Sequence, residues 1–77
     1  MSSTTEKYRW RKVTDINREF AIFELITDEK LLLDVGFSDE GIFEIAFASE
    51  VANLLISWDF FKSVIEEGRK MAELDRL

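Results

Sequence analysis

The segment Leu31–Phe47 constrains the fold of this chain most strongly, because its turn residues and its apolar pattern predict the same strand pairing. Asp39-Glu40-Gly41 matches a three-residue hairpin loop in which Gly41 takes the left-handed conformation. Such a loop sets Ser38 opposite Ile42. The pairs that follow are all apolar: Phe37 with Phe43, Val35 with Ile45, and Leu33 with Phe47. We therefore predict an antiparallel hairpin here.

Two further strands are expected before this hairpin. Lys7–Val13 alternates charged with large side chains, as a half-exposed strand does. Glu19–Ile26 is apolar on both faces, which is typical of a central strand. Thr14–Arg18 favours a turn between them, and Asp28–Lys30 makes a polar break before the third strand, Leu31–Phe37.

The C-terminal residues 57–76 are predicted to form one amphipathic helix. Ser57 is a favourable N-cap, and Asp59 suits the positive end of the helix dipole. We expect Gly68 to let the helix lie close to the sheet, although a glycine without a packing role is the alternative. One apolar stripe recurs at helical spacing: Trp58, Phe61, Val64, Ile65, Gly68, Met71 and Ala72.

Strands followed by a helix predict an α+β fold, in which an antiparallel β-meander over residues 7–47 carries one C-terminal helix packed on one face. The 77 residues suffice for a single domain, residues 1–77, and are too few for two. Residues 1–6 are expected to be disordered. Ala48–Asn53 fits a helical turn. Leu54–Ile56 is either a fifth strand or a buried lead-in to the helix.

Charge is unevenly distributed along the chain. Residues 1–20 carry a net charge of +2 and residues 21–77 carry −8, for a total of −6. An acidic chain is poorly suited to nucleic acid, because phosphates need a basic surface. No apolar run approaches the roughly 20 residues of a membrane span, and Met1–Lys7 lacks the apolar core of a signal peptide. We expect a cytoplasmic protein that binds neither nucleic acid nor membranes.

The sequence contains neither cysteine nor histidine. It therefore has no disulfide, no thiolate nucleophile, no zinc–thiolate site and not the commonest general base. Its three glycines are too scattered to form a phosphate-binding loop. We expect no cofactor and no enzymatic activity.

Three carboxylates form the one group of side chains that is suited to chemistry or to ligand binding. With a three-residue loop between the second and third strands, Ile26 faces Leu32 and Glu24 faces Asp34. Glu44 then lies diagonal to Asp34 on the same side of the sheet. Like charges opposite one another in a sheet are unfavourable, so something should offset them.

Three explanations for these carboxylates are open. Arg9 and Arg11 could reach across and neutralise them, which we favour, because Tyr8 and Trp10 belong in the core and so turn both arginines toward the acids. A basic protein partner is the second explanation, and a calcium or magnesium ion is the third.

The sheet face away from the helix is predicted to bind protein, since one helix can cover only one face. Apolar surface beyond a few hundred Å² usually marks an interaction site. The alternative is that the N-terminal strand and Leu54–Ile56 cover this face. The residues that we expect to form the surface are Phe20, Ile22, Glu24, Leu32, Asp34 and Glu44.

The leading hypothesis is a small acidic protein-interaction module that self-associates as a homodimer. One version is an inhibitor or immunity-type protein for a basic partner, because opposite charges speed association. A second hypothesis is a carboxylate-based protein or enzyme that binds a metal or small ligand at a dimer interface. A third is a structural accessory subunit of a larger complex.

Overall fold

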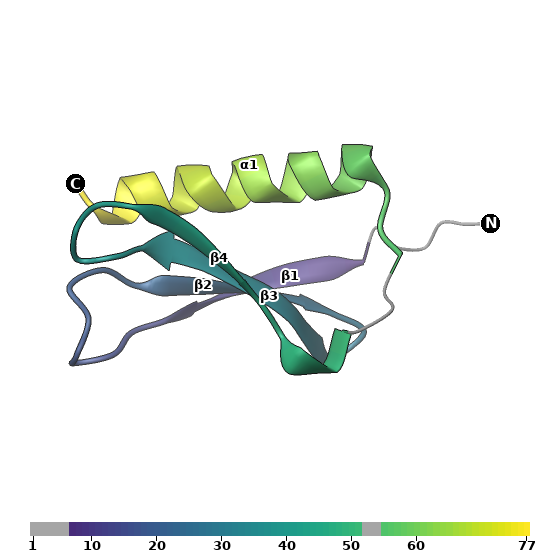
Figure 1. Ribbon diagram of the computed structural model, residues 1–77, viewed down its shortest axis with the longest axis horizontal. Coiled ribbons are helices and arrows are strands. Elements are labelled where there is room, and N and C mark those ends of the chain that lie inside the picture. The colour runs from purple at the N-terminus through teal and green to yellow at the C-terminus, as the bar shows by residue number, and fades with distance from the viewer. Residues whose placement is uncertain (1–6, 52–54) are drawn as a thin grey trace.

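The computed structural model describes residues 7–51 and 55–77. Its strands form one antiparallel sheet in the order β1-β2-β3-β4, and the helix α1 packs against one face of it (Figure 1). This confirms the predicted α+β meander with its C-terminal helix. The elements are β1 (Tyr8–Val13), β2 (Ile22–Thr27), β3 (Lys30–Phe37), β4 (Phe43–Phe47), the 3₁₀ turn η2 (Ser49–Val51) and α1 (Trp58–Asp75).

The hairpin between β3 and β4 has the predicted loop and register. The Ser38 N–H donates to the Ile42 carbonyl at 2.9 Å, and Gly41 takes a φ of +84°, a conformation that glycine adopts without strain. All three predicted apolar pairs are present: Phe37 with Phe43, Val35 with Ile45, and Leu33 with Phe47.

The turn between β2 and β3 is shorter than the sequence suggested. Asp28 and Glu29 alone connect the strands, and both are left-handed, with φ of 50° and 63°. This two-residue hairpin geometry matches the twist of the flanking strands, and it places Lys30 in β3. The polar composition of the break was informative, but its length was not.

A bulge compensates for the shorter turn. Ile26 pairs with Leu31 and not with Leu32, so that part of the predicted register is wrong. The irregularity adds one residue to β3 before the pairing resumes. Glu24 consequently faces Asp34, as expected from the sequence.

The helix begins at the predicted cap and lies close to the sheet at Gly68. The Ser57 hydroxyl accepts a hydrogen bond from the Phe60 N–H at 3.1 Å. A methyl group on Gly68 would come within 2.7 Å of the Trp10 ring and 3.0 Å of Val35. The close approach expected from this glycine is therefore present. The largest fully buried side chains are Leu25, Leu33 and Val35 of the sheet and Val64 of the helix.

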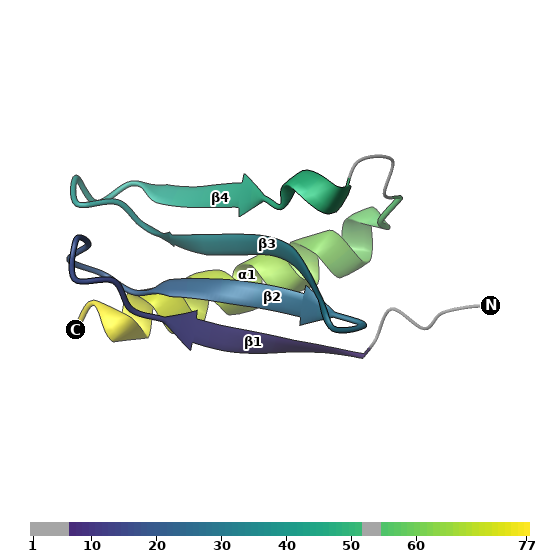
Figure 2. The ribbon, with the colours of Figure 1, turned by 90° about the horizontal axis from the view of Figure 1, so that it is seen from below.

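The helix does not cover the whole sheet. Figure 2, which looks at the opposite face, shows α1 crossing behind β1, β2 and β3, while most of β4 lies beside its outline. In Figure 1 the teal β4 ribbon descends away from the helix toward its Phe47 end. One helix is about 10 Å wide, whereas four strands spaced about 4.8 Å apart span roughly 14 Å.

Several expectations concern the segment between β4 and α1. Ser49–Val51 forms a 3₁₀ turn, in agreement with the helical turn expected there. Leu55 and Ile56 belong to no strand and are exposed. Leu54, the end of Ala48–Asn53 and residues 1–6 lie outside the described residues.

Candidate functional site

The three predicted carboxylates lie together on the sheet face away from the helix. Glu24 faces Asp34 directly, and Glu44 faces Gly36, so it lies diagonal to Asp34. The Arg11 guanidinium donates through Nε to Glu24 at 2.8 Å. Arginine neutralisation is thus confirmed for Glu24.

The remaining charges on this face are less well paired. Burial raises the pKa of Asp34, the neighbouring Glu24 raises it further, and Arg18 partly opposes both effects. Arg9 pairs with Glu29 in the β2–β3 turn at 3.6 Å and not with the three carboxylates. In residues 7–51 and 55–77, no group of three or more acidic side chains is placed to hold a metal ion.

The apolar side chains on the sheet face away from the helix are largely covered. Ile26 and Leu32 are only 5% and 6% exposed, and Ile22 is half-buried. Leu32 belongs to the hydrophobic core, against which Val51 of η2 also packs. Ile42 is the exposed exception. This face therefore lacks the broad apolar patch that the sequence suggested.

Phe20 lies away from the other predicted residues. Its ring is 5.2 Å from the guanidinium carbon of Arg76, which follows the C-terminal end of α1. It sits in the connection before β2, where the alternation of strand faces does not apply. Assigning Phe20 to a strand beginning at Glu19 placed it on the wrong face.

One group of exposed apolar side chains lies instead at β4 and the start of the helix. The Phe47 and Phe61 rings stack at 6.2 Å, and Trp58 lies 6.3 Å from Phe61. Phe47 is 61% exposed and Trp58 is 67% exposed. We call the group Ile45, Phe47, Trp58 and Phe61 the β4 surface. Ile45 shares the helix side of β4 with Phe47.

Exposure increases along β4 because the strand diverges from the helix. At the beginning, the Phe43 ring packs 5.3 Å from Phe37, and the Arg69 guanidinium lies 5.3 Å from the Phe43 ring. At the other end, Phe47 lies opposite Leu33 of β3 and stacks on Phe61 of α1, and it is still mostly exposed. One end of the strand is therefore covered by the molecule itself and the other is open.

The backbone of β4 also has an open edge. The Ser38 N–H donates to Ile42 and the Ala48 N–H donates to Leu32, so even-numbered residues of β4 hydrogen-bond to β3. In an antiparallel ladder, the intervening residues direct their N–H and C=O groups away from that partner. Phe43, Ile45 and Phe47 thus present backbone donors and acceptors at the edge, where no described strand pairs with them.

Sequence reasoning identified these residues as apolar pairs of a hairpin but missed that their strand lies beyond the helix. A signal was available, because one helix is narrower than four strands. Trp58 and Phe61, three residues apart at the start of the helix, also indicated an aromatic cluster there.

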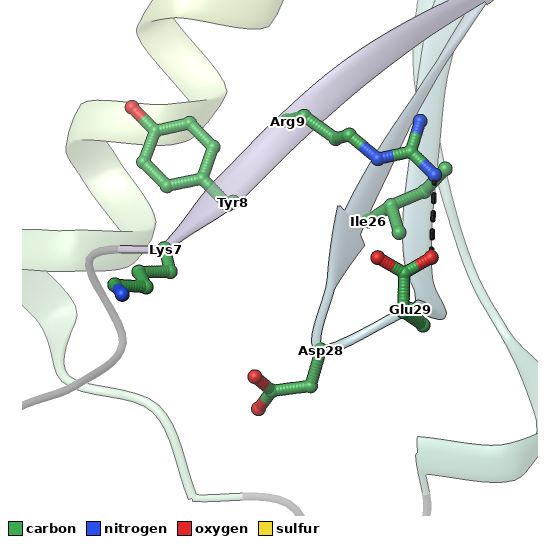
Figure 3. Close-up of a pocket in the computed structure, with 6 residues that line it drawn as sticks. All are labelled: Lys7, Tyr8, Arg9, Ile26, Asp28 and Glu29. Carbon is green, nitrogen blue, oxygen red and sulfur yellow. Dashed lines mark ion pairs between the residues drawn. The ribbon is translucent and has the colours of Figure 1, made fainter.

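A solvent-open hollow of about 550 Å³ lies between the start of β1 and the β2–β3 turn (Figure 3). Arg9 and Glu29 form an ion pair at its wall, and Tyr8 points toward the helix. Lys7 and Asp28 point away from the Arg9–Glu29 pair. The lining groups do not converge on one point, so the hollow offers no arrangement for catalysis or for selective binding.

Comparison with protein-family models, with curated proteins and with solved structures found no match to this chain. Among the described residues, no helix combines the length and the apolar character needed to cross a membrane. The function is therefore argued from the geometry of the β4 surface.

Proposed function

We propose that this chain is a protein-interaction module that binds through the β4 surface. The observation that carries the proposal is an edge strand with exposed apolar side chains beside an exposed tryptophan. Exposed apolar groups that cluster in this way are typical of binding sites, and tryptophan is among the residues that contribute most at interfaces. The proposed setting is the cytoplasm, as expected from the sequence.

The two edge strands of the sheet differ in their charged side chains, and this difference supports the proposal. The outer strand β1 carries Arg9, Arg11 and Lys12, and charged side chains on an edge oppose pairing with other strands. The other outer strand, β4, has Glu44 as its single charge. Strand addition, in which a partner strand extends the sheet, is therefore the binding mode that β4 favours.

A photo-reactive benzoylphenylalanine at position 47 tests the proposal in cells. We expect irradiation to cross-link the chain to protein, either to a second copy or to another chain. Ile16 provides the matched control, because it is fully exposed in the connection that follows β1, the strand at the opposite edge of the sheet from β4. Equal capture from positions 16 and 47, or none from position 47, would contradict the proposal.

Binding of a basic protein through the carboxylate face is a second candidate function. It is favoured by Asp34, which burial and Glu24 make unfavourable to ionise, since a cationic side chain nearby would relieve that cost. An inhibitor or immunity-type protein would use such a face. Replacing Asp34 and Glu44 with their amides leaves the Arg11–Glu24 pair intact. Unchanged salt-dependent binding of basic proteins by this double variant would remove the candidate.

A further inference from the structure

We infer that the β4 surface binds a second copy of this chain, by antiparallel pairing of β4 with itself about a two-fold axis at Ile45. The inference rests on the proposed function and names the partner and the register. The two four-stranded sheets then join at their β4 edges, and both helices lie on the same side.

The backbone geometry permits this register. Phe43, Ile45 and Phe47 are the residues whose N–H and C=O groups point away from β3. With Ile45 opposite Ile45 of the second copy, Phe43 falls opposite Phe47. Each of these pairs is of the hydrogen-bonded type and exchanges two backbone hydrogen bonds. The N–H and C=O groups that point away from β3 then all form backbone hydrogen bonds between the two copies of β4.

The side chains of β4 are symmetric about the same point. The strand reads Phe-Glu-Ile-Ala-Phe, so the axis at Ile45 places aromatic against aromatic and isoleucine against isoleucine on the helix side. On the other side, Glu44 meets Ala46. Sliding the strands so that the axis falls at Glu44 would set two carboxylates opposite one another, which is destabilising. The sequence of β4 thus favours the axis at Ile45 over the axis at Glu44.

The covered and open ends of β4 complement each other in this arrangement. Phe47 of one copy meets Phe43 of the other, which the Arg69 guanidinium approaches to 5.3 Å. The exposed ring then gains both an aromatic neighbour and a cation. Phe47 and Trp58, at 61% and 67% exposure, together present roughly 200–300 Å² per copy, taking 150–250 Å² for a whole aromatic side chain.

The net charge of the chain predicts a different salt dependence for binding a second copy than for binding a basic protein. Both copies carry a net charge of −6, so they repel at long range, and added salt screens that repulsion. Self-association should therefore strengthen as salt is raised. A complex between this chain and a basic protein should weaken under the same change.

Single cysteines test the register, because the natural sequence contains none. In the inferred pairing, the two Ile45 Cα atoms lie about 5.5 Å apart, within disulfide reach. The two Glu44 Cα atoms lie about 8 Å apart, beyond that reach. Under mild oxidation, Ile45→Cys should form a covalent dimer and Glu44→Cys alone should not.

Mixing Glu44→Cys with a third variant, Ala46→Cys, gives the sharpest control. Glu44→Cys and Ala46→Cys should cross-link to each other, because the register sets these positions opposite. Rapid cross-linking of Glu44→Cys with itself would point to another register and overturn the inference. The same would follow if Ile16→Cys, at an unrelated exposed site, cross-linked as fast as Ile45→Cys.

A charge exchange tests the same pairing without a disulfide. Ile45→Lys and Ile45→Glu should each raise the dissociation constant of the homodimer at least about tenfold, because like charges face each other at the axis. An equimolar mixture should sediment as a heterodimer. Circular dichroism checks that each variant retains its fold, and Phe47→Ser is the alternative variant if either unfolds.

The outcomes separate the inference from the proposed function. A chain that sediments as a monomer at all concentrations and salts overturns the second-copy inference. If photo-cross-linking at position 47 still captures another protein, the interaction module stands with a different partner. If position 47 captures nothing, both fail.

Discussion

The two flanks of the helix meet the sheet in different ways. On the β1 flank, the Trp10 ring lies against Gly68 and its Nε1 donates to the Glu67 carboxylate at 2.7 Å. Tyr8 donates to the same oxygen at 3.0 Å, and Lys12 pairs with Asp75 at 2.7 Å. This flank is closed by packing and by directed polar contacts.

On the β4 flank, the contacts are apolar stacking and cation–π interactions, and exposure increases toward Phe47. A 77-residue domain can thus complete its core on one side of a single helix and leave apolar side chains exposed on the other side. Stability should accordingly depend on the β1 flank, and binding should depend on the β4 flank.

Filling the space at Gly68 should break the β1 flank and produce the largest loss of stability. Gly68→Val places methyl groups where the Trp10 ring and Val35 already stand. We expect the free energy of unfolding to fall by about 1–3 kcal/mol, the usual cost of overpacking. Urea unfolding measures this, and Ser63→Ala on the exposed side of the same helix is the control. If Gly68→Val were as stable as the parent, the Trp10 ring and Val35 would have to move aside without a loss in the free energy of unfolding.

Removing the Glu67 carboxylate should have the next largest effect. Glu67→Ala leaves both the Tyr8 hydroxyl and the Trp10 indole N–H without their shared acceptor. Hydrogen bonds to charged groups support an expected loss of about 1–2 kcal/mol in the free energy of unfolding. Glu66→Ala, one residue earlier and exposed, should change it little. Equal losses in the two variants would argue against the shared acceptor.

Some features of the fold could be predicted from the sequence, and others could not. The hairpin register, the N-cap at Ser57 and the close approach at Gly68 were predictable from local patterns, because each depends on residues near in sequence or on one periodic stripe. Glu67 was not identified, since a carboxylate on a helix surface shows no sign in the sequence of the two β1 donors that will reach it.

The candidate site was less predictable than the fold. The pairing of Glu24 with Asp34 was predicted, whereas the burial of Leu32 was not, because a bulge in β3 is set by a turn length that composition leaves undetermined. The exposure of Phe47 depends on where the helix crosses the sheet. That crossing is a property of the whole packing arrangement, not of any one segment.

A polar substitution on the β4 flank should lower the free energy of unfolding much less than a substitution on the β1 flank. Phe47→Ser removes a mostly exposed ring, so we expect the monomer to lose less than about 1 kcal/mol in its free energy of unfolding. The measurement belongs at micromolar concentration or below, where any self-association is suppressed. A loss as large as that of Gly68→Val would mean that β4 is part of the core, and the difference between the flanks would disappear.

The smallest expected effect is an acid sensitivity of the Lys12–Asp75 contact on the β1 flank. The hydrogen bond from Lys12 lowers the pKa of Asp75, the backbone N–H of Ala21 lowers it further, and burial partly opposes them. A carboxyl whose pKa is lower in the folded state stabilises the fold above its unfolded pKa of about 3.9. That contribution is lost as pH falls from there through the lower folded pKa.

Asp75→Asn should therefore lose stability relative to the parent at neutral pH, and the two unfolding curves should converge once the pH has fallen below the lowered pKa of the folded-state Asp75 carboxyl. Lys12→Gln should remove the larger part of the same pH dependence, because Lys12 is the principal cause of the shift. If the unfolding curve of Asp75→Asn ran parallel to that of the parent across this range, the Lys12–Asp75 contact would not hold β1 to the helix in solution, and the closed flank would depend on Glu67 and Gly68 alone.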